Sequence, residues 1–496
     1  MRKKILSTAL ALLFAVTSTI TGLASATGST FATLSDYQNQ KLVWKDCNDG
    51  LQCATMKVPV DYAQITAGKS FTLFLLRHVA SKKAKRLGSL VVNPGGPGGS
   101  GVEYAAGWDS IISHAVSDRY DIVGFDQRGV NLSEPIRCLT DSQEDAFLSA
   151  DGKVTDKASL ASAIASAKDF ANKCALAAGS KLAHYSTQDG ARDMELLRGL
   201  LGDTKLNYMG KSYGTYLGTL YANLYPTHVG KMILDGAIDP KESVVNSNLD
   251  QAKGFELALT SFVASNPSIT ISAISRALDK LPANPLKPES VKRTLTQSLA
   301  LTGIAFGLYD NQTGWPDLYT ALTALIRYSS PTKLLAMADD YNYRDSNGHF
   351  ASNQSDLQGV ISCLDFADPR SIAQMSADLP KFLTVAPTFG PYLGYAGLSC
   401  KFWKAPPVVT SNFTSLLSVT PILVIGVTRD PATPYQSAIA LHHYFAKSIL
   451  LTFDGDGHTG HNRGSSCIDT KVDSYLLTGA LPAASLTCKA ANSRTI

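Results

Sequence analysis

Short runs of consecutive apolar residues, each closed by glycine, proline or a polar turn, recur along this chain. Three lie in its first half, at residues 87–93, 120–125 and 231–235, and two lie near its C-terminus, at 420–427 and 448–453. A strand that is covered on both faces carries such a continuous run, whereas a half-exposed strand alternates. The pattern therefore predicts buried strands of a mostly parallel sheet.

Helical spacing separates several of these strands. Residues 142–179 and 186–201 have helical patterns, and the second range begins with an acid-rich turn. Residues 53–62 and 70–79 are dense in β-branched and aromatic side chains and predict two early strands. Strands that alternate with helices favour an α/β fold with helices on both faces of the sheet. The polar residues 27–44 predict an extended lead-in.

The alternation of strands and helices stops at Asp239-Pro240 and resumes at residue 420. Between these points the chain shows helical patterns, loops and aromatic-rich turns, without apolar runs of the strand kind. We interpret this stretch as a helical cap inserted before the last two strands. The predicted division is a signal peptide at 1–26, a first core part at 27–239, a cap at 240–414 and a second core part at 415–496.

The N-terminus has the three parts of a secretory signal peptide. A basic segment at residues 2–4 precedes an apolar run at 5–23, and Ala24-Ser25-Ala26 follows. This order predicts export with cleavage after Ala26. A membrane anchor is the alternative, but serine and threonine dilute the run, and no later apolar stretch is long enough to span a bilayer. We expect a secreted protein without membrane contact after cleavage.

Charge excludes some classes of partner. The chain has 45 Lys and Arg against 41 Asp and Glu, and loss of the basic segment at 2–4 leaves a net charge of about +1. A balance this close to neutrality does not favour binding to nucleic acid or to an anionic membrane. The hydrophobic share of 45% is ordinary for a globular protein. The sequence leaves the oligomeric state open, with a monomer as the default.

Eight cysteines, an even number in an exported chain, indicate disulfides. Many connectivities are possible, and pairing each cysteine with its neighbour in sequence gives four local loops. A zinc site is the alternative, but the chain lacks the C-x-x-C and H-x-x-x-H spacings of zinc ligands, so we expect no metal. The predicted pairs are Cys47 with Cys53, Cys138 with Cys174, Cys363 with Cys400, and Cys467 with Cys488.

One pentapeptide, Gly210-Lys211-Ser212-Tyr213-Gly214, is the only G-x-S-x-G in the chain. A short apolar run precedes it, and a helical pattern rich in small residues follows it. In the order strand, tight turn, helix, such a motif holds its serine at a sharp corner with the hydroxyl outward. This predicts a nucleophilic serine at position 212.

An activated serine needs a histidine base and a carboxylate that orients the base. In open-sheet hydrolases these follow the serine in chain order, on loops after the last two strands. The strand ending at residue 427 is followed by Asp430, and the strand ending at 453 is followed by His458. We therefore predict Asp430 as the acid and His458 as the base.

Other histidines and aspartates are alternatives for these roles. His461 is the nearest rival base, whereas His442 and His443 lie in a predicted helix and are expected at the surface. Asp454 and Asp456 are too close to His458 in sequence to approach it from a separate loop. Asp430 is the better acid.

The glycine-rich segment after Asn93 is suited to an oxyanion hole, which needs two backbone N–H groups aimed at the developing charge. We predict the N–H of Tyr213, directly after the serine, and the N–H of Gly96. Residues 96–101 also match G-x-G-x-x-G before a helical pattern that runs to about residue 116, which is a dinucleotide fingerprint. A secreted protein meets little NAD, so we expect no cofactor.

With these residues identified, the chain resembles the secreted tripeptidyl aminopeptidase family of α/β-hydrolases, relatives of the prolyl iminopeptidases. The resemblance implies an α/β-hydrolase fold with a mainly helical cap, and it implies Ser212, Asp430 and His458 as nucleophile, acid and base. The motifs that carry it are NPGGPGGSG (93–101), YDIVGFDQRG (120–129), GARDMELLR (190–198), GKSYGTYLG (210–218), ILDGAIDP (233–240), TRDPATP (428–434) and GDGHTG (455–460).

Two departures from the family pattern touch loops around the pocket. Asn131 stands where the family has the second glycine of R-G-x-G-x-S, and Pro94 stands where iminopeptidases have a histidine. These changes bear on the choice of substrate more than on catalysis.

The resemblance implies a serine exopeptidase that releases di- or tripeptides from peptides with a free N-terminus. Such an enzyme must hold an α-ammonium, and Glu103 and Asp365 are candidate carboxylates for it, with an ordinary surface position as the alternative for each. An esterase or amide hydrolase with the same triad stays open, since one fold serves both chemistries. A binding protein without activity is disfavoured because all three triad residues are present. Aromatic residues of the cap that could line a pocket are Trp315, Tyr319, Tyr392, Tyr395 and Trp403.

Overall fold

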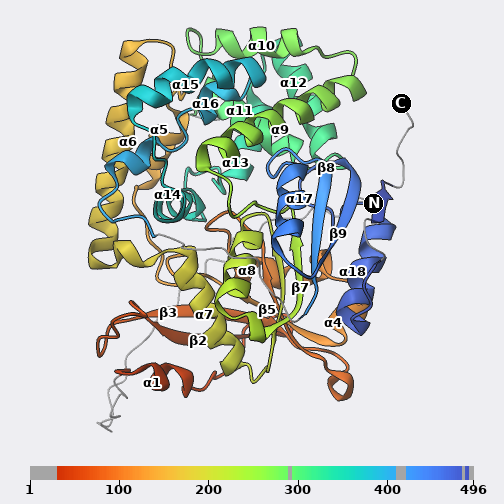
Figure 1. Cartoon of the computed structure of the whole chain (residues 1–496). Helices are drawn as coiled ribbons and strands as arrows, with labels where there is room; N and C mark the ends of the chain where they lie inside the picture. The colour runs from red at the N-terminus through yellow and green to blue at the C-terminus, as the bar shows by residue number, and fades with distance from the viewer. Residues whose placement is uncertain (1–30, 289–292, 409–419, 483–485, 491–496) are drawn as a thin grey trace.

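A computed structural model describes residues 31–288, 293–408, 420–482 and 486–490 (Figure 1). The predicted signal peptide at residues 1–26 lies outside the described residues. A ten-stranded sheet runs through the lower part of Figure 1, and a thick layer of helices covers its upper end. The fold is therefore an α/β architecture with a helical insert region.

The sheet has the strand order β1-β2-β3-β5-β4-β6-β7-β8-β9-β10. The pairs from β1 to β5 along this order are antiparallel, and all pairs from β5 to β10 are parallel. The strands are β1 (Lys45–Asp46), β2 (Leu51–Pro59), β3 (Ser70–His78), β4 (Gly88–Asn93), β5 (Tyr120–Phe125), β6 (Leu206–Lys211), β7 (Val229–Asp235), β8 (Ile422–Arg429), β9 (Ser448–Asp456) and β10 (Leu486–Lys489).

The strands predicted from continuous apolar runs lie in the middle of this sheet. Every residue of β4 and of β5 is buried, as expected for parallel strands with helices on both faces. Val91 pairs with Val123 on one side and with Tyr208 on the other. The prediction of an α/β-hydrolase fold with a mostly parallel sheet is confirmed.

Helices connect the parallel strands, and several of them begin at side-chain caps. Ser186, for example, accepts a hydrogen bond from the backbone N–H of Asp189 and starts α7. The helices outside the insert are α1 (Leu34–Gln38), α2 (Gly101–Ala106), α3 (Trp108–Ile111), α4 (His114–Ser117), α5 (Asp141–Ser149), α6 (Lys157–Ala178), α7 (Thr187–Leu200), α8 (Tyr213–Leu224), α17 (Tyr435–Tyr444) and α18 (Ser466–Thr478).

The helical insert lies between β7 and β8 and has a hydrophobic core of its own, centred on α9, α11, α12 and α13. Helices α5 and α6, which follow β5, also lie in the upper layer and contact it (Figure 1). The exact domain boundaries at 239 and 414 stay a prediction. The insert helices are α9 (Val244–Ser265), α10 (Ile271–Lys280), α11 (Gln297–Leu308), α12 (Gly314–Tyr328), α13 (Thr332–Tyr341), α14 (Gln354–Asp365), α15 (Ile372–Val385) and α16 (Gly390–Leu393).

The structure contains the four predicted disulfides, Cys47–Cys53, Cys138–Cys174, Cys363–Cys400 and Cys467–Cys488. Two of them hold the helical layer together, since Cys138–Cys174 ties the segment after β5 to α6, and Cys363–Cys400 ties α14 to the 3-10 turn at Leu398–Phe402. The pairing of sequence neighbours was therefore the right choice.

Some local expectations were wrong. Residues 27–44 were expected to be extended, but Thr33 starts α1 with a capping box that its polar sequence allows. The single helix expected after the glycine loop is three short helices, because Gly107 and Ser113 stand at new helix starts. The strands β1 and β10 were missed, since two and four residues are too short to form a recognisable pattern.

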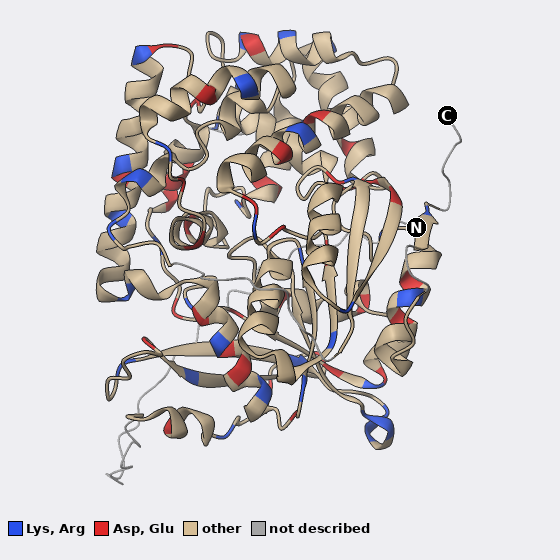
Figure 2. Ribbon diagram, in the orientation of Figure 1, with Lys and Arg blue, Asp and Glu red and all other residues tan. Residues whose placement is uncertain are grey.

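Charged residues of both signs are scattered over the sheet and the helical layer (Figure 2). Within the described part of the chain, no helix is both long enough and apolar enough to cross a membrane.

Candidate active site

Ser212 occupies the corner between β6 and α8. Its φ of 54° and ψ of −125° lie outside the regions that residues other than glycine prefer, which is typical of a nucleophile elbow. The backbone N–H of Ser212 donates to the carbonyl oxygen of Asp235 at the end of β7 and so fixes the corner to the next strand. The Ser212 side chain is half-buried and lies on a pocket wall.

Steric contacts explain why both outer positions of the pentapeptide are glycine. A Cβ on Gly210 would lie 2.3 Å from the carbonyl oxygen of Gly214, and a Cβ on Gly214 would lie 2.7 Å from Oδ1 of Asn93. Strand β6, helix α8 and the end of β4 therefore pack too closely for any side chain at either position.

His458 and Asp430 form a buried pair beside Ser212. Nδ1 of His458 lies 2.9 and 3.0 Å from the two carboxylate oxygens of Asp430. The backbone N–H groups of Ala432, Thr433 and Thr459 also donate to that carboxylate. The carboxylate is thus fixed by four donors, and it in turn fixes the orientation of the imidazole.

The loop that carries His458 is clamped from the neighbouring strands. Asp235, at the end of β7, accepts hydrogen bonds from the N–H groups of Gly460 and His461 at 2.7 and 3.0 Å. Lys211, at the end of β6, donates to the carbonyl oxygen of His461 at 2.9 Å. Burial lowers the pKa of Lys211 to about 8, although the nearby Asp235 acts in the opposite direction.

The insert also contacts His458. The backbone N–H of His458 donates to the carbonyl oxygen of Tyr309, which directly follows α11, at 2.8 Å. The two rings pack edge to face, with centroids 5.0 Å apart. The position of the imidazole therefore depends on a residue about 150 positions away in the sequence, a contact that no local pattern could reveal.

The alternative bases and acids have other partners. His461 is buried, and its burial together with Lys211 lowers its pKa to about 3, so it is neutral. Asp454 and Asp456 both pair with Arg429. His442 contacts the hydroxyl of Ser448. In the described structure only His458 lies against Asp430.

The glycine loop after β4 lies against the Ser212 corner. A Cβ on Gly95 would lie 2.9 Å from the Cβ of Ser212 and 3.2 Å from the backbone nitrogen of Tyr213, so only glycine permits this approach. Gly96 has a φ of 118° and lines the same pocket as Ser212. Tyr213 is the first residue of α8, where N–H groups have no partner within the helix. Both predicted oxyanion donors thus lie beside the serine.

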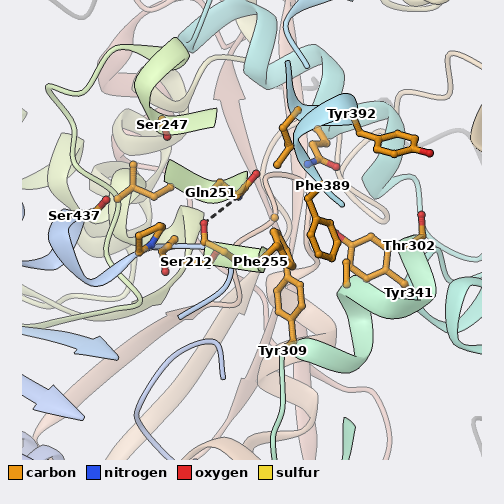
Figure 3. Close-up of a pocket in the computed structure, with 18 of the residues that line it drawn as sticks. Ser212, Ser247, Gln251, Phe255, Thr302, Tyr309, Tyr341, Phe389, Tyr392 and Ser437 are labelled. Atoms are coloured by element: carbon orange, nitrogen blue, oxygen red, sulfur yellow. Dashed lines mark hydrogen bonds between the residues drawn. The ribbon is translucent and has the colours of Figure 1, made fainter. Parts of the chain in front are cut away.

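Ser212 lines two pockets. The first, which we call the cap-side pocket, has a volume of about 400 Å³ and lies between the Asp430 loop and the insert. Figure 3 shows Ser212 and Ser437 on one side of it and aromatic rings on the other. Gln251 from α9 crosses to the Asp430 loop by donating to the carbonyl oxygen of Ala432. The apolar wall consists of Phe255, Leu301, Ala305, Phe389, Tyr392 and Leu393.

The second pocket, which we call the loop-side pocket, has a volume of about 600 Å³ and is more polar. The glycine loop, the His458 loop and the helix α14 surround it. Its charged residues are Glu103, Lys211 and Arg463. Tyr309 and Tyr341 line both pockets and stand between them.

The predicted substrate carboxylates lie in different places. Glu103 lines the loop-side pocket and accepts a hydrogen bond from the side-chain amide of Asn131. Asp365 is not among the described residues that line either of these two pockets. Its carboxylate accepts hydrogen bonds from the backbone N–H and the hydroxyl of Thr187, and burial raises its pKa to about 7. This position fits a structural contact at the start of α7.

Of the cap aromatic residues named from the sequence, Tyr392 lines the cap-side pocket. Trp315, by contrast, packs edge to face on Phe262 in the core of the insert. The other four aromatic residues of the pocket, which sequence reasoning missed, are Phe255, Tyr309, Tyr341 and Phe389.

Comparison with known proteins adds the family context. A family described as TAP-like protein matches residues 386–488. The chain is 35% identical to serine protease Hip1 of Mycobacterium tuberculosis, covering 90% of this chain and 91% of that protein. It is 36% identical to carboxylesterase B of the same species, covering 90% and 89%. It is 30% identical to tripeptidyl aminopeptidase of Streptomyces lividans, covering 90% and 86%. The relatives thus include both peptidases and an esterase at similar identity.

Proposed function

Because the chain belongs to the TAP-like family of α/β-hydrolases and is a serine hydrolase, we propose that it is a serine exopeptidase that releases di- or tripeptides from free N-termini. The observation that carries this proposal is the position of Ser212 on the walls of two pockets. A peptide continues on both sides of the scissile bond, so its hydrolysis needs room on both sides of the nucleophile.

In the proposed mechanism Ser212 is the nucleophile. Its Oγ attacks the scissile carbonyl carbon while His458 takes the hydroxyl proton, and the C=O bond opens to an oxyanion. His458 then gives that proton to the leaving amine as the C–N bond breaks, which leaves an acyl-enzyme. Water repeats the sequence with His458 as the base, and it releases the N-terminal fragment as a carboxylic acid. Asp430 keeps Nδ1 of His458 protonated and stabilises the imidazolium.

The N–H groups of Gly96 and Tyr213 stabilise the oxyanion in this proposal. The close approach of the glycine loop to Ser212 supports the assignment. Thr433 supports the base, since its hydroxyl lies 3.4 Å from Nδ1 of His458 and its N–H donates to Asp430.

Secretion is part of the proposal. Four disulfides are typical of proteins that fold in an oxidising compartment, and the sequence predicts a signal peptide at residues 1–26.

A carboxylesterase is the second candidate, and the observation that favours it is the 36% identity to carboxylesterase B. Esters and peptides share the acyl-transfer chemistry, so the triad does not separate them. The large, polar loop-side pocket supports the peptidase, because a small alcohol leaving group would leave it unfilled.

The Ser212→Ala variant tests the mechanism. We expect it to lose at least about 10⁴-fold in kcat on a free-amine tripeptide anilide and on a p-nitrophenyl ester alike, because nothing replaces the nucleophile. Chromogenic assays of both substrates measure the loss, and circular dichroism checks the fold. Retained turnover in the variant would contradict the mechanism.

The same assays separate the two candidate functions in the wild-type protein. A peptidase of the proposed kind hydrolyses the free-amine anilide and discriminates against its N-acetylated form. Turnover of the ester without turnover of either anilide would favour the esterase.

A further inference from the structure

The two pockets at Ser212 differ in their relation to the base, and this sets the direction of the substrate. His458 lines the loop-side pocket, and it is not among the described residues that line the cap-side pocket. Because the base must protonate the leaving amine, that amine lies on the side of His458. The C-terminal part of the substrate therefore occupies the loop-side pocket, and the acyl part occupies the cap-side pocket.

The acyl part of an aminopeptidase substrate carries the free α-ammonium. This step rests on the proposed function. The ammonium therefore enters the cap-side pocket, whose wall is largely apolar on the side of the insert. A cation in such a pocket needs a nearby carboxylate, since burying an unpaired charge is costly.

Glu242 is the only charged residue among the described residues that line the cap-side pocket. It lies between the end of β7 and the start of α9, and the negative charge of Asp250 on α9 acts on its carboxyl group. Asp239 adds a third acid nearby. Burial, followed by Asp250 and Asp239, raises the pKa of Glu242 to about 7, while Lys253 acts weakly in the opposite direction.

We propose that Glu242, supported by Asp250, binds the α-ammonium of the substrate and thereby selects peptides with a free N-terminus. Lys253 pairs with Asp250 at 2.7 Å. A cation beside Glu242 relieves the repulsion that remains from Asp250 and Asp239 and forms a charge-assisted hydrogen bond. The wall of the cap-side pocket thus carries a negative charge that suits a cation.

The other two candidate carboxylates fit this role less well. Glu103 lies in the loop-side pocket, on the side of the leaving group, and two cationic residues, Lys211 and Arg463, share that pocket with it. Asp365 is occupied by two hydrogen bonds from Thr187 and lines neither pocket in the described structure. Glu242 therefore replaces both as the predicted ammonium site.

The test compares Glu242→Gln with the wild-type enzyme on three substrates: a free-amine tripeptide anilide, its N-acetylated form and p-nitrophenyl acetate. Loss of one charge-assisted hydrogen bond lowers kcat/KM for the free-amine anilide by about 10- to 100-fold. The two uncharged substrates change less than about twofold, because they make no use of that charge. Turnover of the acetate ester reports that Ser212 and the fold are intact.

Two further variants serve as controls. Asp169→Asn removes one negative charge from α6 at an exposed position paired with Lys173, lines neither pocket, and leaves all three rates unchanged. Glu103→Gln keeps the preference for the free amine, because its carboxylate lies on the leaving-group side.

The results overturn the inference in three cases. These are a preference for the free amine that persists in Glu242→Gln, a preference that is lost in Glu103→Gln instead, and a parallel loss of ester turnover in Glu242→Gln. If the wild-type enzyme itself does not distinguish free from acetylated peptides, the proposed exopeptidase function fails and the ammonium site fails with it. If the wild-type enzyme prefers the free amine and Glu242→Gln keeps that preference, only the assignment of the ammonium site is contradicted.

Discussion

The end of the sheet and the helical insert both reach Ser212, but they are built differently. The loops after β6, β8 and β9 carry the proposed catalytic residues Ser212, Asp430 and His458 and fix them through backbone hydrogen bonds, such as those that Asp430 accepts from Ala432 and Thr433. The insert presents side chains to the same pocket from helices far apart in sequence, such as Phe255 from α9 and Tyr341 from α13. Backbone hydrogen bonds at the sheet end hold a fixed geometry for the reaction. Side chains from separate helices of the insert form a pocket whose shape can change by substitution.

This contrast predicts that substitutions at the sheet end affect all substrates equally, whereas substitutions in the insert affect substrates selectively. The variants below test the contrast, from the largest expected effect to the smallest.

Asp430→Asn is expected to lower kcat by about 10³- to 10⁴-fold on peptide and ester substrates alike, since the wrong tautomer of His458 becomes stable. Steady-state kinetics on both substrate types measure the loss. Asp456→Asn is the matched control, because Asp456 pairs with Arg429 and not with His458. A loss of kcat for peptides but not for esters in Asp430→Asn would contradict the expectation that the sheet end affects all substrates equally.

Tyr309→Ala tests a contact between the insert and His458, the proposed base. The variant loses the ring that packs on His458, and we expect kcat to fall by about 10- to 100-fold for all substrates, because a small displacement of a catalytic group is costly. Tyr309→Phe keeps the ring and should retain most of the activity. If Tyr309→Ala altered only KM for peptides, Tyr309 would belong functionally with the other pocket residues of the insert.

The ratio of kcat/KM for the free-amine anilide to that for its acetylated form should depend on pH. Binding needs an ionised Glu242 and a protonated substrate amine. Burial, Asp250 and Asp239 raise the pKa of Glu242 to about 7. The pKa of the amine is about 8. The ratio therefore rises as the pH increases through about 7, by up to about tenfold per pH unit below it, and falls above about 8. Any group that acts on both substrates alike cancels in the ratio.

A pH series of initial rates measures this profile. In Glu242→Gln the rising limb near pH 7 should disappear. A rising limb that survives the substitution would mean that another group controls recognition of the amine.

The sequence predicted the sheet end well for a physical reason. A buried parallel strand is continuously apolar, and the loops after such strands meet at one edge of the sheet, so the positions of Ser212, Asp430 and His458 at that edge could be predicted from chain order. The glycines at 95, 210 and 214 were recognisable because close backbone contacts exclude any side chain there.

The pocket could not be predicted in the same way. Trp315 and Tyr392 lie in helices α12 and α16 of the insert, and only the packing of those helices decides that Tyr392 lines the pocket while Trp315 contacts Phe262. Glu242 lies two residues after the ILDGAIDP motif, so its position near the sheet end was a usable signal, but Asp250 comes near it only when α9 forms.

The most direct test of the central claim is the product pattern from an unmodified peptide of about ten residues and its N-acetylated form, followed by mass spectrometry over time. We predict fragments shortened from the N-terminus by two or three residues at each step, while the acetylated peptide stays intact. Both peptides remaining intact under conditions in which a p-nitrophenyl ester is hydrolysed would contradict the proposed function.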